Sequence, residues 1–412
     1  LPASTDYVYD NGFWTPQDPS GIATIDDNIQ VLSGTTALTA NTFINNVTLS
    51  PGATLDLGTT TLSTAGNITN TGALTASDAT LELNGTSAQS IFGNEFELGS
   101  LTLNNPEGAI LSAPLKLTTL LTLTNGQLNT SNLLTLGSDV NGTAMVDVIT
   151  GGSIVGNVTT ERYIPARRAF RLLSSSVTST TSINTNWQEG GNNTGINYPA
   201  DNVDPNPGYG THITGSTTGE NGFDATGSGN PSLFALNNGA QAWEAITNTD
   251  VTTLTAGTPL RLMVRGDRSI DLTTNAATPS NTTLRSTGTL ATATIQTTGA
   301  DLNHNAGAFN FIGNPYQASV NVNDVLAGSN NIKASEVWVW DATLGARGQY
   351  VTVLLDGTGS SNGATSKSYH YIQPGQSFFT ATENTVGDNS TSVVFNETDK
   401  AVGNDVTVFN NH

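Results

Sequence analysis

Residues 81–85 read Leu-Glu-Leu-Asn-Gly, residues 101–105 read Leu-Thr-Leu-Asn-Asn, and residues 121–126 read Leu-Thr-Leu-Thr-Asn-Gly. In each stretch two leucines flank a polar residue, which is the alternation of a short β-strand, and turn-forming residues follow. The three stretches start 20 residues apart. A repeat of this length is typical of solenoids, in which each unit buries its apolar face only by stacking on the next.

The same apolar-polar-apolar triplet recurs through the first part of the chain, as Val47-Thr48-Leu49, Leu55-Asp56-Leu57, Leu115-Lys116-Leu117 and Leu134-Thr135-Leu136. We predict a parallel β-helix (β-solenoid) over residues 46–160. The leucines expected inside it are Leu49, Leu57, Leu83, Leu103, Leu117, Leu123 and Leu136. An antiparallel sandwich, in which the triplets pair as hairpins, is the alternative. The dominance of leucine over aromatic residues and the lack of long alternating strands favour the β-helix.

Residues 1–45 precede the regular triplets and are predicted to form an N-terminal cap segment. The aromatic residues of this segment are Tyr7, Tyr9, Phe13 and Trp14. They suit a cover over the open end of a stacked core, which repeat arrays need. The alternation of residues 5–9 also suits a strand that is donated to a neighbouring copy, which makes Tyr7 and Tyr9 candidate interaction residues.

The charge balance excludes several kinds of partner. The chain has 412 residues, with 13 basic and 33 acidic side chains and a net charge of −20. Phosphate backbones and anionic membrane surfaces are both bound through Lys and Arg, so neither nucleic acid nor a membrane surface is an expected partner. The chain contains no Cys, which excludes disulfides and thiolate metal sites. No apolar run approaches the ~18 residues of a membrane-spanning helix.

The composition changes near residue 160. Residues 1–160 contain 13 acidic residues and one basic residue, whereas residues 161–412 contain 20 acidic and 12 basic residues. Longer strands with more aromatic residues follow, at 170–173, 260–264, 309–312, 337–340 and 377–380. We predict an all-β fold in which the β-helix is followed by a jelly-roll-like β-sandwich over residues 161–412, with a long polar loop at 189–231.

Two side-chain arrangements follow from this prediction of a second domain. At least one of Trp338 and Trp340 is expected to face the core of the sandwich. The basic side chains near the division of the chain are expected to pair with carboxylates. These side chains are Arg162, Arg167, Arg168 and Arg171.

Several segments of the chain are similar to segments that occur together in a known group of proteins. They include Gly156-Asn157-Val158-Thr159-Thr160-Glu161-Arg162-Tyr163-Ile164-Pro165, Phe311-Ile312-Gly313-Asn314-Pro315-Tyr316 and Ile372-Gln373-Pro374-Gly375-Gln376-Ser377-Phe378-Phe379. In these segments the chain resembles large surface proteins of Bacteroidota that are exported by the type IX secretion system. The resemblance implies export, an extracellular cell-surface location, and an adhesin or scaffold role without a shared enzymatic activity. Proteins of this kind usually continue into a C-terminal sorting domain, whereas this chain stops at Asn410-Asn411-His412, so we expect that domain to have been cleaved or omitted.

No catalytic residue and no organic cofactor are predicted, and we expect that the protein is not an enzyme. The four histidines stand apart in the sequence, without the spacing of a zinc site, and no nucleophile or phosphate-binding motif occurs. Polysaccharide cleavage in a β-helix would need paired carboxylates or a basic group near the acid. Asp56 and Glu82 lie at outward triplet positions, and we interpret them as solvated charges.

The polar loop supplies the remaining candidates. Asp201 and Asp204 are the candidate ligands of a calcium ion, since carboxylate oxygens are the donors that Ca²⁺ prefers. An acidic loop without a metal is the alternative. Four aromatic residues near polar loops are candidates for stacking on sugar rings or for contact with a partner: Trp187, Tyr198, Tyr209 and Trp243.

The expected function is that of an extracellular structural or adhesive surface protein, which self-assembles into a filament or a surface layer. A non-catalytic carbohydrate-binding protein is the alternative, and a β-helix enzyme that degrades polysaccharides is a further one. The expected partners are therefore other copies of the chain or extracellular glycans. Exposed aromatic rings would favour glycan binding, whereas a cleft with paired carboxylates would favour the enzyme.

Overall fold

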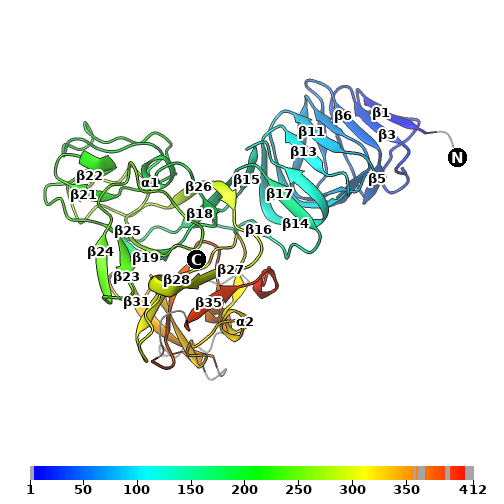
Figure 1. Ribbon diagram of the computed structural model, residues 1–412. Helices are drawn as coiled ribbons and strands as arrows, with labels where there is room; N and C mark the ends of the chain where they lie inside the picture. The colour runs from blue at the N-terminus through cyan, green and yellow to red at the C-terminus, as the bar shows by residue number, and fades with distance from the viewer. Residues whose placement is uncertain (1–3, 356–358, 361–366, 386–389, 404–412) are drawn as a thin grey trace. The chain divides into compact units, whose positions relative to one another are not determined.

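The computed structural model describes residues 4–355, 359–360, 367–385 and 390–403. The chain divides into two compact units, residues 1–137 with 143–159 and residues 138–142 with 160–412. The regular secondary structure of both units is almost entirely β-strand (Figure 1), so the all-β prediction is confirmed. The apolar-polar alternation of Val406-Thr407-Val408-Phe409 predicts one more strand, which lies outside the described residues.

The first unit is a stack of short parallel strands, drawn from blue to cyan in Figure 1. Its strands are β1 (Asp6–Asp10), β2 (Phe13–Thr15), β3 (Asn28–Val31), β4 (Thr35–Ala37), β5 (Thr42–Ile44), β6 (Asn46–Leu49), β7 (Thr54–Asp56), β8 (Thr61–Thr64), β9 (Ile68–Asn70), β10 (Ala73–Leu83), β11 (Gln89–Gly93), β12 (Phe96–Asn104), β13 (Ala109–Ser112), β14 (Leu115–Asn129), β15 (Leu134–Leu136), β16 (Met145–Val146) and β17 (Gly152–Val155).

The register of these strands places leucine on leucine from one turn to the next. Leu81 pairs with Leu101, and Leu101 pairs in turn with Leu121. Leu103 lies in a second such column, between Leu83 and Leu123. The seven leucines predicted to face inward are all at most 1% exposed. The parallel β-helix is therefore confirmed and the antiparallel alternative is wrong.

The solenoid begins earlier in the chain than the triplets indicate. Strand β1 pairs in parallel with β3, and β3 with β6, so that Tyr7, Ile29 and Val47 form one buried column. Residues 6–44 are thus built into the turns instead of forming a separate cap. The physical reason is that this segment carries the same alternation, with aromatic and β-branched residues in place of leucine. Only β2 differs, because it pairs antiparallel with β1.

Buried amides complete the corners of the solenoid, where the backbone cannot pair with another strand. The side chain of Gln89 is 2% exposed, and its Nε2 donates to the carbonyl oxygens of Thr64 and Gly66, at 2.9 and 2.6 Å. Its Oε1 accepts from the backbone N–H of Gly85 and from Nδ2 of Asn105. These bonds satisfy backbone groups that would otherwise be buried without partners.

The second unit combines several sheets with short helices. From β18 onward the elements are β18 (Val158–Ile164), β19 (Ala169–Leu173), β20 (Val177–Thr178), α1 (Ile183–Trp187), β21 (Thr214–Ser216), η1 (Glu220–Gly222), β22 (Asp224–Ala225), β23 (Leu233–Asn237), β24 (Ala242–Ala245), β25 (Leu260–Val264), β26 (Thr282–Leu290), β27 (Ile295–Thr298), η2 (Gly299–Asp301), β28 (Phe309–Gly313), β29 (Val320–Asn321), α2 (Val322–Ala327), β30 (Glu336–Asp341), β31 (Gln349–Leu354), β32 (Gly359–Ser360), η3 (Lys367–His370), β33 (Tyr371–Ile372), β34 (Ser377–Ala381), β35 (Ser392–Phe395) and η4 (Glu397–Asp399).

Two larger antiparallel sheets organise this unit, one with the strand order β19-β25-β23-β24 and one with the order β28-β34-β30-β31-β32. One face of each sheet enters a common hydrophobic core, to which Leu262, Ile312 and Val339 belong. The opposite faces meet at a smaller cluster made of Leu172, Phe311 and Phe379. This second contact is the part of the fold that positions the candidate site.

Candidate functional site

Strand β30 turns both of its tryptophans away from the main core. Val337 and Val339 are at most 1% exposed, whereas Trp338 and Trp340 are half-buried on the opposite face. The expectation that at least one tryptophan faces the core is therefore wrong for the main core, but both tryptophans pack against the smaller cluster of Leu172, Phe311 and Phe379. Residues two positions apart in a strand share a face, so the two tryptophans point the same way, while Val337 and Val339 point the other way into the main core.

Trp338 belongs to an aromatic surface that is shared by the two large sheets, and Trp340 packs edge-on against Tyr350 of that surface, with 4.7 Å between centroids. We define the aromatic face as Trp243, Phe309, Trp338, Tyr350 and Phe379. The ring of Phe309 packs edge-on against Trp338, with 4.9 Å between centroids, and the ring of Tyr350 lies 5.7 Å from that of Phe379. The ring of Trp243, from the other sheet, lies 6.1 Å from the ring of Phe379.

The aromatic face encloses a cavity and remains accessible. The cavity has a volume of about 330 Å³ and is lined by the five aromatic residues together with Leu236 and Gln241. Its volume falls within the ~300–1,000 Å³ that is usual for ligand pockets. Phe309 is 43% exposed and Tyr350 is 45% exposed. Large rings are seldom exposed in a group without a binding role, so this cavity is the best candidate site in the described part of the chain.

The turn between β23 and β24 fixes the two sheets together at this cavity. Gln241 lies in this turn, and its Oε1 accepts from the backbone N–H of Phe309 at 2.9 Å. Its Nε2 donates back to the carbonyl oxygen of Phe309 at 2.8 Å. Gln241 therefore takes the place of a partner strand beside β28. The ring of Phe309 is thereby held on a backbone whose hydrogen bonds are satisfied, which suits a preformed site.

A guanidinium group lies within the aromatic surroundings of the site. The Cζ atom of Arg261 is 4.0 Å from the ring centroid of Trp243, 4.7 Å from that of Phe170 and 4.8 Å from that of Phe234. Burial lowers the pKa of Arg261. Among the described residues this guanidinium forms no ion pair with a carboxylate, so aromatic faces are its main partners.

The aromatic residues that were predicted to contact a ligand lie in different environments in the structure. Trp243 lies on the aromatic face. Trp187 is 2% exposed in the core and donates its indole N–H to Oγ of Ser286, so it cannot stack on a ligand. Tyr209 lies under the guanidinium of Arg285, 4.2 Å from it.

Two further groups of aromatic residues lie apart from the aromatic face. Tyr7 and Tyr9 are buried within the solenoid. Tyr198 is 46% exposed and donates its hydroxyl to the carbonyl oxygen of Ser269. Four members of the aromatic face were not predicted as ligand contacts: Phe309, Trp338, Tyr350 and Phe379. The alternation of aromatic residues in β30 was the signal for Trp338, and the same alternation of Phe309 and Phe311 in β28 was the signal for Phe309.

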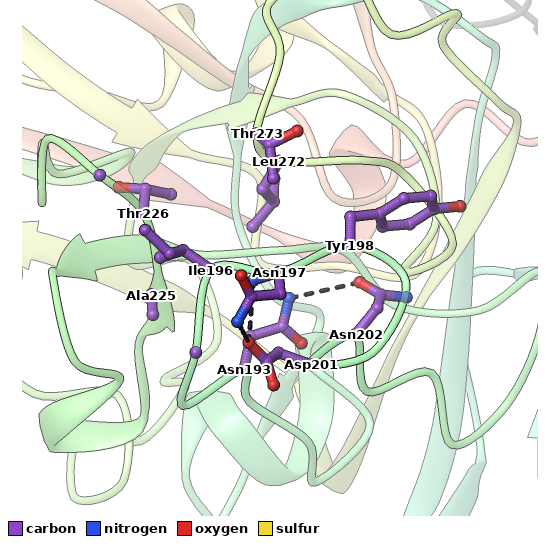
Figure 2. Close-up of a pocket in the computed structure, with 12 residues that line it drawn as sticks. Asn193, Ile196, Asn197, Tyr198, Asp201, Asn202, Ala225, Thr226, Leu272 and Thr273 are labelled. Atoms are coloured by element: carbon purple, nitrogen blue, oxygen red, sulfur yellow. Dashed lines mark hydrogen bonds between the residues drawn. The ribbon is translucent and has the colours of Figure 1, made fainter.

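Tyr198 and Asp201 line a different and smaller cavity. Figure 2 shows the side chains of Asn197 and Asp201 facing each other, with the ring of Tyr198 turned away from them. Oδ2 of Asp201 accepts from both the backbone N–H and Nδ2 of Asn197, each at 2.8 Å. The cavity has a volume of about 150 Å³. This volume is below the usual range for ligand pockets, and the carboxylate is occupied by the loop itself.

The structure gives the second candidate calcium ligand different neighbours. Burial raises the pKa of Asp204, the negative charge of Asp267 raises it further, and Arg268 and His212 act in the opposite direction. Asp201 and Asp204 thus interact with different groups. In the described ranges no group of three or more acidic or histidine side chains is arranged to hold a metal ion.

A buried ion pair connects the polar loop at 189–231 to the rest of the unit. Both side chains of the pair, Arg268 and Asp224, are fully buried. Nη2 of Arg268 lies 2.8 Å from Oδ1 of Asp224, and Nη1 lies 3.1 Å from Oδ2. The same carboxylate accepts from the backbone N–H groups of Asn193 and Ile213, at 2.8 and 2.9 Å. Contacts with the protein itself therefore hold this loop.

Because of this ion pair, we expect the free energy of unfolding of the second unit to fall at acidic pH. Burial by itself raises the pKa of Asp224, but its interactions with His212 and Arg268 outweigh that effect, and the net pKa is lowered. Its contribution to stability is therefore complete above the unfolded pKa of about 3.9 and is lost as the pH falls through the lower folded value. We expect the urea midpoint, followed by tryptophan fluorescence, to drop steeply below about pH 4.

Asp224→Asn tests whether the carboxyl group of Asp224 causes this loss of stability at low pH. The variant should be less stable near neutral pH, because the buried Arg268 loses its counter-charge. Its midpoint should also fall less steeply below about pH 4. Parallel pH curves for the wild type and the variant would show that other carboxyl groups cause the acid dependence.

The two carboxylates considered for catalysis, Asp56 and Glu82, lie on different sheets of the solenoid. Asp56 lies in β7, which pairs with the first part of β10, whereas Glu82 lies in the last part of β10 and accepts from Oγ of Ser63. Another cavity of the second unit is larger, with a volume of about 810 Å³. The acidic residues among those that line it are Glu244 and Asp301. Both are exposed. A general acid is typically a carboxyl group in a buried or crowded environment, and neither side chain is in one.

Comparisons with known proteins give no relative of this chain: no family model, no curated protein and no solved structure matches it. No helix in the described ranges is both long enough and apolar enough to cross a membrane. The aromatic face and its surroundings are therefore the features of this chain that point to a function.

Proposed function

We propose that this protein is an extracellular, non-catalytic adhesive protein of the cell surface, which binds glycans through the aromatic face of its second unit. The observation that carries the proposal is the accessible cavity of about 330 Å³ between Trp243, Phe309, Trp338, Tyr350 and Phe379. Sugar rings present apolar C–H faces, which pack well against rigid aromatic rings and leave the hydroxyl groups in water. Export and a surface location are proposed from the resemblance to type IX secretion substrates.

The alternative location for adhesion, the N-terminal end of the solenoid, is less well supported. Strand donation between copies would need β1 to be free along one edge. In the structure β1 pairs with β2 on one side and with β3 on the other. The outer strand β2 has three residues, and short edge strands of this kind discourage pairing with other chains. We therefore place the adhesive contact on the second unit.

Substitution of the two most exposed rings of the aromatic face tests the proposal. Phe309→Ala combined with Tyr350→Ala should weaken binding to an immobilised polysaccharide by at least about tenfold, which corresponds to the loss of about 1.4 kcal/mol. Phe13→Ala is the matched control, because that ring is 77% exposed in the first unit and should leave binding unchanged. Screening the wild type on an array of glycans selects the polysaccharide for this measurement.

Two results would contradict the proposed function. One is a wild-type protein that binds no glycan on the array. The other is a double variant that retains its fold, as judged by circular dichroism and thermal unfolding, and binds as tightly as the wild type. The second result would move the contact away from the aromatic face.

A further inference from the structure

A group of arginines lies next to the aromatic face without carboxylate partners. Strands β19 and β25 are antiparallel, with Ala169 opposite Val264. Continued by one residue, this register places Arg168 opposite Arg265. The loop between β30 and β31 joins them, since the backbone N–H of Phe170 donates to the carbonyl oxygen of Arg347. We call Arg168, Arg265 and Arg347 the arginine cluster.

The positive charges of the arginine cluster are poorly compensated by neighbouring protein groups. Nη2 of Arg168 donates to Oδ1 of Asn275 at 2.8 Å, while its Nε is buried without a hydrogen-bond partner. No ion pair between the arginine cluster and an Asp or Glu occurs in the part of the chain that the structure describes. Burial lowers the pKa of Arg265, and the charges of Arg168 and Arg347 lower it further.

The prediction that the basic residues near residue 160 pair with carboxylates is therefore wrong for Arg168. It is also wrong for Arg167, which donates to the carbonyl oxygen of Gly345. Arg171 donates to the carbonyl oxygen of Phe170; burial lowers its pKa to about 10, and the negative charge of Asp341 acts in the opposite direction. Like charges that face each other across two strands destabilise a sheet. The chain has 33 acidic residues and nine arginines, so carboxylates for pairing are abundant. Packing alone gives no reason for three arginines to gather, whereas an anionic ligand would compensate all three.

The arginine cluster continues the aromatic face along one side of the same sheet. Arg261 and Arg265 both lie on β25 or next to its end, four positions apart, so they share a face. At ~3.3 Å per residue, about 13 Å of strand separates them. Arg261 already contacts the ring of Trp243. A ligand that stacks on the aromatic face and reaches the cluster is therefore an extended chain of several units.

We propose that the ligand is an acidic polysaccharide, whose sugar rings stack on the aromatic face and whose carboxylate or sulfate groups pair with Arg168, Arg265 and Arg347. This inference rests on the proposed function and names the ligand class of the same site. Guanidinium groups suit such anions because two parallel N–H groups can bind two oxygens at once. The net charge of −20 repels a polyanion from a distance, but salt at physiological strength screens charges beyond ~8 Å and leaves the contact pairs effective.

The experiment compares polymers that share a backbone and differ in charge. Polygalacturonate and its methyl ester test for carboxylate recognition, and dextran sulfate and dextran test for sulfate recognition. Binding is measured by affinity electrophoresis for the wild type, for Arg168→Gln combined with Arg265→Gln, and for Lys333→Gln. Lys333 is the control because its ammonium group pairs with Glu336 outside the cluster.

We expect the wild type to bind at least one charged polymer about tenfold or more tightly than its neutral counterpart. A preference for polygalacturonate over its methyl ester identifies carboxylate as the recognised anion. A preference for dextran sulfate over dextran identifies sulfate. The arginine double variant should lose this preference and still bind the neutral polymer, while Lys333→Gln should behave as the wild type. Relief of the repulsion between two arginines should keep the double variant folded.

Other outcomes separate this inference from the proposed function. Equal binding of charged and neutral polymers by the wild type would overturn the acidic ligand and leave glycan binding in place. A charge preference that survives in the arginine double variant would overturn the role of the cluster. No binding of any of the four polymers would count against both proposals.

Discussion

Arg268→Met is expected to destabilise the second unit by about 3–5 kcal/mol, which is the usual effect of removing one partner from a buried ion pair. The variant leaves the carboxylate of Asp224 fully buried without the guanidinium, with Nδ1 of His212, 3.2 Å from Oδ1, as its remaining side-chain partner of basic character. It also removes the donor to the carbonyl oxygen of Val203 at 2.9 Å and the donor to that of Thr211 at 3.2 Å. Since single domains are stable by only about 5–15 kcal/mol, the unit should lie close to unfolding.

Urea unfolding followed by tryptophan fluorescence measures this effect, because four of the five tryptophans belong to the second unit. Arg347→Met is the matched control. That side chain is exposed and has no ion pair among the described residues, so its removal should change the free energy of unfolding by less than about 0.5 kcal/mol. Asp224→Asn combined with Arg268→Met should recover part of the loss, since no unpaired charge then remains buried. A loss below about 1 kcal/mol for Arg268→Met alone would show that water reaches the pair.

Leu103→Ala is expected to destabilise the solenoid by about 2–5 kcal/mol. The side chain is fully buried between Leu83 and Leu123 in neighbouring turns. Removing it deletes contacts to both neighbours and leaves a cavity that the regular backbone cannot close. Because each turn packs only on its neighbours, the damage should be strongest in the turns next to β12.

Amide hydrogen exchange, read by mass spectrometry of peptides, locates this effect. Peptides from residues 80–125 should lose protection in Leu103→Ala, whereas peptides from the second unit should exchange as in the wild type. Thr102→Ala in the same strand is the control, because Thr102 points outward and should cost less than about 1 kcal/mol. Equal loss of protection in both variants would mean that strand propensity, and not packing of the leucine column, determines stability there.

The sequence by itself determined the solenoid. Each buried column of the solenoid joins residues about one repeat apart, such as Leu81, Leu101 and Leu121. The spacing of the triplets therefore predicts which residues pair. The start of the solenoid was predicted too late, because Tyr7 and Ile29 carry the same alternation without leucine. The division of the chain near residue 160 was visible in the charge balance, since a unit with a single basic residue must solvate its surface differently.

Only the tertiary structure decided the candidate site. Trp243 and Phe379 are 136 positions apart in the sequence, and their contact depends on how two sheets pack together. Strand alternation indicates that Trp338 and Trp340 share a face, but which face meets the core depends on that packing as well. The same holds for the arginines: a sequence shows that Arg168 and Arg265 are charged, whereas antiparallel pairing over nearly one hundred residues places them opposite each other. Periodic local patterns encode contacts between neighbouring repeats, and contacts between distant segments arise only when the whole core has formed.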